Sequence, residues 1–186
     1  LFGLLLVILV TNEYTFRTNR QNIIDGWERK QFVYAKLVWV LLLATTAFVM
    51  AGLTALVSGA VYSTTPFSIE GFVYLFYYFL QVLLTLSFAL LLSVWVKRAG
   101  FAIVIFLGYT MMLEQTGVFL LKKYAGKVGG LLPLQTGDEL LPFPLVGKMI
   151  NSSADRYDDS TYLLFLVLYI ALAIYLVFRK VLKSDL

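Results

Sequence analysis

Long apolar runs separated by short polar breaks dominate the chain, and they predict membrane-spanning helices. Four runs are long enough, at 1.5 Å per residue, to cross a hydrocarbon core of about 30 Å. They are predicted at residues 37–62, 69–96, 100–121 and 161–178. A fifth run at residues 1–10 reaches about half that distance. We expect it to be the cytoplasmic end of a truncated span, in a chain that is the C-terminal part of a longer protein.

Three polar stretches separate or follow these runs: residues 11–36, 122–160 and 179–186. The first is called the connector below, and the last is a short basic tail. Within 122–160, residues 131–150 are apolar but broken by three prolines. We favour short re-entrant helices that dip into the outer leaflet, shielded by protein, over a small cap of helices outside the membrane. The predicted fold is a single all-α transmembrane domain: four complete spans and one partial span.

Composition supports membrane residence and narrows the chemistry. The chain is 60% hydrophobic and 14% charged, whereas soluble domains are typically about 45–50% apolar and a quarter charged. It contains neither cysteine nor histidine, so it lacks the commonest general base and the usual zinc ligands. No acid pair or nucleophile–base pair emerges. We therefore predict no catalytic residues, no metal site and no enzymatic activity in this chain.

The distribution of basic residues predicts the orientation. Ten of the fifteen Lys and Arg lie in the connector, the turn at Lys97–Arg98 and the tail, whereas the five in residues 122–160 are accompanied by five acidic residues. Cytoplasmic loops of membrane proteins are enriched in Lys and Arg. The connector and the C-terminus are thus predicted to be cytoplasmic, in a multi-pass protein of a cell membrane, with the bacterial cytoplasmic membrane as the expected compartment.

The connector carries an amphipathic pattern. Ile23, Ile24 and Trp27 fall on one helical face, and a break between two short helices is predicted at Asp25–Gly26, because glycine disfavours a helix interior. A polar face is formed by Arg17, Arg20 and Gln21. Two interpretations fit equally well on these grounds: the apolar face docks on a partner protein, or it lies on an anionic lipid surface.

The connector also resembles that of ABC-2 type ABC-transporter permeases. The residues that carry the resemblance are Glu13, Thr15, Arg17–Thr18, Arg20–Ile24, Asp25–Gly26, Arg29–Lys30 and Lys36. The basic chain end, from Phe178 to the late Asp185, is similar as well. The motif covers about 25 residues, and the predicted order of spans agrees with the family along nearly the whole chain.

This resemblance implies six helices in the complete protein, a re-entrant outer loop and a connector that acts as a coupling helix. In the family, the coupling helix docks in a groove of a nucleotide-binding subunit, which favours a protein partner over lipid. The docking residues would be Arg17, Thr18, Arg20, Gln21, Ile23, Ile24, Asp25, Gly26 and Trp27. Because no Walker sequence is present, ATP and Mg would bind to a separate ATPase subunit and no cofactor to this chain. The remaining expected partners are a second permease chain and the bilayer, with no nucleic acid.

Polar residues inside the spans are candidates for a translocation path. Glu114 and Gln115 fall in the outer third of their span, and Gln81 falls nearer the middle of its own. An intramembrane ionisable residue is a candidate functional site. The favoured alternatives are structural: Glu114 reaches the interface or pairs with Lys122 or Lys123, and Gln81 hydrogen-bonds across helices.

The sequence thus predicts the permease subunit of an ATP-driven exporter whose cargo it does not identify. Two other classes are weighed against it. One is a non-transport scaffold or receptor whose connector lies on lipid. The other is an intramembrane enzyme that uses Glu114, which is disfavoured because no histidine or cysteine accompanies that residue.

Overall fold

The computed structural model describes residues 1–16, 18, 21, 24, 26–62, 71–141 and 156–183. The regular elements of this part of the chain are all helices. Four stretches are long and apolar enough to cross a membrane: Arg29–Val61, Phe72–Val96, Ala99–Leu131 and Asp159–Lys183. The four long apolar helices predicted from the sequence are therefore present, and they indicate a multi-pass, membrane-associated protein.

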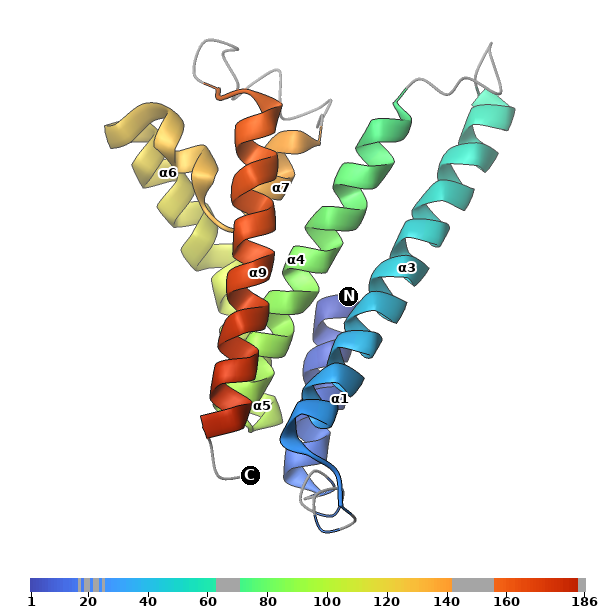
Figure 1. Ribbon diagram of the computed structural model, residues 1–186. Helices are drawn as coiled ribbons and strands as arrows, with labels where there is room; N and C mark the ends of the chain where they lie inside the picture. The colour runs from blue at the N-terminus through green and yellow to red at the C-terminus, as the bar shows by residue number, and fades with distance from the viewer. Residues whose placement is uncertain are drawn as a thin grey trace.

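Three long helices, α3 (Arg29–Tyr62), α4 (Phe72–Val96) and α9 (Asp159–Lys183), run the height of the molecule. Helix α4 packs against both α3 and α9, and also against the shorter α1 (Phe2–Thr15). The chain then continues through α5 (Ala99–Gly108), the π-helix η1 (Tyr109–Leu113) and α6 (Glu114–Ala125). Figure 1 shows α3 on one flank of the molecule and α6 on the other.

Two helices are longer than the predicted spans, whereas α4 begins at Phe72 rather than at residue 69. Helix α3 begins at Arg29 rather than at residue 37, and α9 extends from Asp159 to Lys183 rather than over residues 161–178. The reason is that apolar runs measure the length buried in lipid, whereas polar residues continue a helix into water. Long Lys and Arg side chains suit such ends, because their stems cover apolar surface while their charges stay solvated.

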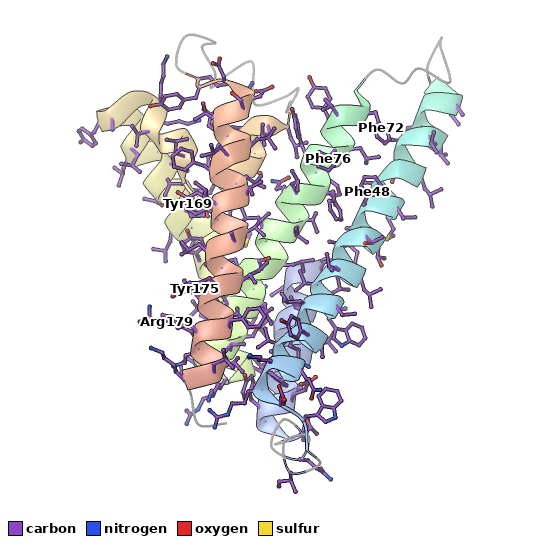
Figure 2. The ribbon with its side chains drawn as sticks, viewed as in Figure 1. Phe48, Phe72, Phe76, Tyr169, Tyr175 and Arg179 are labelled. Atoms are coloured by element: carbon purple, nitrogen blue, oxygen red, sulfur yellow. The ribbon has the colours of Figure 1, made fainter. Side chains whose placement is uncertain are left out.

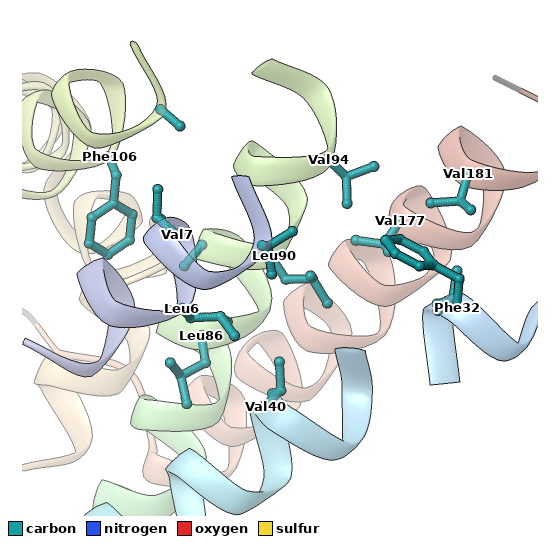
Figure 3. Close-up of a cluster of buried hydrophobic side chains, with 14 of the residues drawn as sticks. Leu6, Val7, Phe32, Val40, Leu86, Leu90, Val94, Phe106, Val177 and Val181 are labelled. Carbon is teal, nitrogen blue, oxygen red and sulfur yellow. The ribbon is translucent and has the colours of Figure 1, made fainter. Parts of the chain in front are cut away.

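The larger of two buried clusters surrounds α1. Gly3, Leu6, Val7, Val10 and Thr11 are buried on one side of this helix at the spacing of successive turns. Figure 3 shows Leu6 and Val7 among side chains of α3, α4, α5 and α9. A methyl group on Gly3 would lie 2.5 Å from Cζ of Phe106. The absence of a side chain at Gly3 therefore leaves room for the Phe106 ring where α1 meets α5.

The second cluster holds a helix that turns back along the bundle. After α6, the 3-10 helix η2 (Gly126–Leu131) leads into α7 (Gln135–Leu140), which packs against α4 and α9. Leu140 lies with Leu84 of α4 and with Tyr162, Leu166 and Ile170 of α9. In Figure 1, α7 lies beside the upper part of α9 rather than beyond its tip. The end of the molecule that carries α7 is called the α7 end below, and the opposite end the connector end.

Candidate functional site

The connector presents its apolar residues to the surroundings. Of the nine docking residues expected from the sequence, the structure describes Thr18, Gln21, Ile24, Gly26 and Trp27, and all five are exposed. Arg17, Arg20, Ile23 and Asp25 lie outside the described residues. Ile24 is 83% exposed and Trp27 is 46% exposed. Two of the three residues predicted to form an apolar face are thus open to a partner or to lipid.

The chain reverses at Gly26 and re-enters a helix at Arg29. Gly26 has a φ of 95°, a left-handed conformation that glycine adopts readily and other residues rarely do. A turn is therefore present at Gly26, but the helix that follows it is the long α3 and not the second short helix that was predicted. The side-chain oxygen of Gln31 accepts a hydrogen bond from the backbone N–H of Glu28 at 2.9 Å, which satisfies one of the donors left unpaired at a helix start. Trp27 thereby sits immediately before a well-formed helix.

An ion pair joins the two ends of the connector. Lys36 of α3 donates to a carboxylate oxygen of Glu13 of α1, across 23 positions of sequence. Lys36 is only 6% exposed, and its Nζ lies 4.9 Å from the centroid of the Phe32 ring, within cation–π range. From the sequence, Glu13 and Lys36 were singled out only as motif positions of the connector. The sequence feature that could have predicted this pair is the presence of opposite charges near the two ends of the connector.

Tyr14, next to Glu13, contacts both α3 and a third segment, the turn between α4 and α5. Its ring meets Phe32 edge to face at 6.2 Å, and Nζ of Lys97, from the turn between α4 and α5, lies 5.4 Å from its centroid. Burial, with a smaller contribution from the charge of Glu13, raises the pKa of Tyr14 to about 12. The phenol therefore stays neutral at physiological pH. We call Glu13, Tyr14, Phe32, Lys36 and Lys97 the connector root.

Glu114 does not form the ion pair expected from the sequence. Its Oε1 accepts hydrogen bonds from the backbone N–H groups of Leu134 at 2.6 Å and Gln135 at 3.0 Å, and the residue is 3% exposed. Lys122 pairs instead with Glu139 at 2.6 Å, and Lys123 lies over the ring of Tyr124. A carboxylate is favoured at the start of α7 because the first N–H groups of a helix have no partner within it.

The other two candidate path residues differ in their surroundings. Gln81 of α4 donates to the carboxylate of Asp138 on α7, so the hydrogen bond between helices expected for Gln81 is confirmed. Gln115 is exposed on α6. Gln81 and Glu114 therefore both hold α7, and the structure does not bring Gln115 to them. A role of the three residues in a translocation path stays a prediction.

Comparison with known proteins places the chain in a family. Residues 1–186 match the model of a family described as protein of unknown function, DUF2705. The chain is a member of the DUF2705 family. No curated protein matches it, and no solved structure does either.

The connector root of this DUF2705 protein joins three segments of the chain. The connector root ties α1, α3 and the α4–α5 turn together, while the segment between Glu13 and Lys36 carries exposed Ile24 and Trp27. Among the described residues, no group of three or more Asp and Glu is placed to hold a metal ion.

Proposed function

We propose that this DUF2705 protein is the permease subunit of an ATP-driven transporter, coupled through its connector to a separate ATPase chain. One observation carries the proposal: the connector exposes Ile24 and Trp27 at its tip, while its two ends are tied by the Glu13–Lys36 ion pair. Aromatic residues such as tryptophan are typical anchors of protein interfaces. The tied ends would allow a docked partner to move two helices.

The mechanism is mechanical. ATP and Mg bind to the partner ATPase, and closure of two ATPase chains on each other displaces the connector of each permease chain. The displacement passes through Lys36 and Phe32 into α3, and through Glu13 and Tyr14 into α1. Tilting of these helices opens a path between two permease chains, and export of the cargo follows.

The charge distribution supports a cytoplasmic connector and C-terminus, and the compartment that we propose is the bacterial cytoplasmic membrane. The described residues of the connector end include eight Lys or Arg and two acidic residues, Glu13 and Glu28, whereas those of the α7 end include four Lys or Arg and five acidic residues. The end rich in Lys and Arg faces the cytoplasm in most membrane proteins. The ATPase would therefore meet the connector on the side where ATP is available.

A scaffold or receptor whose connector lies on lipid is the second candidate. The same exposure of Trp27 favours it, because tryptophan also prefers the membrane–water interface. The two functions differ in what touches Trp27, which makes this residue the one to test.

The test is affinity purification of the tagged protein from its native membranes. We expect an ATPase chain with Walker motifs to co-purify. Trp27→Ala should weaken its binding by about thirtyfold, the effect of losing an interface anchor worth about 2 kcal/mol, and Ile24→Asp should do the same. Trp39→Ala is the matched control, because Trp39 is 47% exposed but lies within α3. Equal recovery of the ATPase with Trp27→Ala and Trp39→Ala, or no ATPase with the unmodified protein, would refute the proposal.

A further inference from the structure

Helix α9 has one exposed face whose chemistry changes in order along the helix. Leu164, Leu168, Leu172 and Tyr175 are each half or more exposed, and Arg179 follows on the same face one turn later. The opposite face is buried in the bundle. Figure 2 shows Tyr175 and Arg179 on the outer side of α9, near the connector end. The order along this face is aliphatic, then aromatic, then cationic.

The length of this face matches one leaflet of a bilayer. From Leu164 to Arg179, α9 rises about 22 Å, roughly half of a bilayer of about 40–45 Å including its headgroups. The leucines would lie at the depth of the acyl chains, Tyr175 at the interface and Arg179 at the level of the headgroups. Along this face, the aliphatic, aromatic and cationic residues therefore match in order the acyl chain, the interface and the phosphate of a phospholipid.

A second cation and a second aromatic residue lie beside the lower end of this face. Nζ of Lys180 lies 5.8 Å from the ring centroid of Trp95 on α4, and Trp95 is more than half exposed. Arg179 and Lys180 are neighbours in sequence, so the two cations lie at nearly the same level along α9, Arg179 below Tyr175 on the exposed face and Lys180 on the side toward Trp95. Neither cation forms an ion pair with an acidic residue in the described part of the chain.

The surrounding charge favours an anion at this place and not at the α7 end. Of the two described acidic residues at the connector end, Glu13 is already paired with Lys36. At the α7 end, by contrast, Lys122 pairs with Glu139 and Arg156 pairs with Asp159. Among the described residues, the foot of α9 thus carries an excess of positive charge that an external anion would neutralise.

We propose that Arg179 and Lys180, with Tyr175 and Trp95, bind the phosphate of an anionic phospholipid whose acyl chain lies along Leu164, Leu168 and Leu172. A guanidinium offers paired donors that match phosphate oxygens, and the ammonium adds a second charge. The two aromatic rings flank the headgroup at the interface. This site is independent of the transport proposal, because it requires neither the connector nor an ATPase.

Native mass spectrometry of the purified protein tests the site with phosphatidylglycerol and phosphatidylcholine of identical acyl chains. The unmodified protein should retain phosphatidylglycerol preferentially. The double variant Arg179→Gln/Lys180→Gln should weaken that binding by about fivefold for each cation removed. The matched control is Lys123→Gln/Lys127→Gln, which removes the same charge from exposed positions at the α7 end. Equal retention of both lipids, or equal loss in both double variants, would overturn the proposal.

Two further arms separate the lipid from a small anion and from misfolding. Inorganic phosphate at millimolar concentration should leave phosphatidylglycerol bound, because the acyl chain contributes to binding; displacement by phosphate would identify a small-anion site and overturn the lipid assignment. The charge-conserving variant Arg179→Lys/Lys180→Arg should keep most of the binding. If it binds as weakly as the glutamine variant while both retain the native melting temperature, charge does not hold the lipid and the proposal fails.

Discussion

Lys36 is the residue on which the geometry of the connector depends. Its ammonium group is almost fully buried between the carboxylate of Glu13 and the ring of Phe32. A buried charge is tolerated only when it is paired, because the transfer from water is costly. The pair therefore fixes where α1 ends relative to where α3 begins.

Loss of either partner should destabilise the protein, and loss of both should not. Glu13→Gln leaves the buried ammonium without its anion, and we expect a cost of about 1–3 kcal/mol. This range lies below that of a fully buried pair, because the Glu13 side chain is 31% exposed. Glu13→Gln/Lys36→Met should return toward wild-type stability, since methionine fills the same space beside Phe32. Thermal unfolding in detergent, followed by circular dichroism, measures both; additive losses in the double variant would contradict a coupled pair.

Glu114 is a second residue that stabilises the fold through the two backbone N–H groups that it binds. Glu114→Leu should leave the N–H groups of Leu134 and Gln135 without an acceptor, at a cost of about 1–3 kcal/mol. Glu114→Gln keeps an acceptor oxygen and serves as the control. Amide hydrogen exchange at Leu134 and Gln135 should accelerate in the leucine variant and change little in the glutamine variant. Unchanged exchange in Glu114→Leu would show that the carboxylate does not hold α7.

At the scale of elements, the turn from α6 through η2 into α7 depends on close backbone approach. A methyl group on Gly129 would lie 2.7 Å from the backbone nitrogen of Lys122 and 3.0 Å from the carbonyl oxygen of Val118. Backbone atoms cannot move aside as a flexible side chain can. The 3-10 helix η2 can therefore fold back on α6 only where the chain lacks a side chain.

Gly129→Ala should accordingly loosen the α7 end, whereas alanine at an open helical glycine should not. A methyl group added to Gly100 in α5 would meet no atom within 4 Å, and Gly100→Ala should be neutral or stabilising by up to about 1 kcal/mol. We expect Gly129→Ala to lower the unfolding temperature and to expose residues 126–140 to limited proteolysis. Identical proteolysis of the two variants would contradict the close packing of η2 on α6.

The sequence was sufficient to predict the long helices, because the requirement that backbone groups be satisfied in lipid is local. Contacts between elements were not predictable in the same way. Glu114 was expected to reach the interface or to pair with Lys122 or Lys123 on the same helix, but a segment twenty positions away folds back and supplies backbone donors. The Glu13–Lys36 pair likewise depends on how α1 and α3 pack against each other, and the spacing of apolar residues along the sequence does not predict that packing.

At the scale of the whole molecule, the two ends differ in charge and in the segments that form them. The connector end gathers the ends of α1, α4 and α9 with the starts of α3 and α5, whereas the α7 end is built by the segment that folds back from α6 (Figure 1). The excess of Lys and Arg at the connector end predicts that it faces the cytoplasm.

Single cysteines test this orientation cleanly, because the chain has none of its own. Tyr124→Cys at the α7 end should react with a membrane-impermeant maleimide on intact cells, since Tyr124 is 78% exposed. Lys183→Cys at the connector end should react only after the cells are permeabilised. The reverse pattern would place the connector outside the cell and remove its access to an ATPase.

The central claim is that a separate ATPase contacts the connector, and cross-linking from Ile24 tests it most directly. A photoreactive amino acid in place of Ile24, activated in native membranes, should yield an adduct with a chain that carries Walker motifs. The same group in place of Leu172, on the exposed face of α9, should yield lipid adducts and none with that chain. Lipid adducts alone from position 24 would contradict the account and favour a connector that lies on the membrane surface.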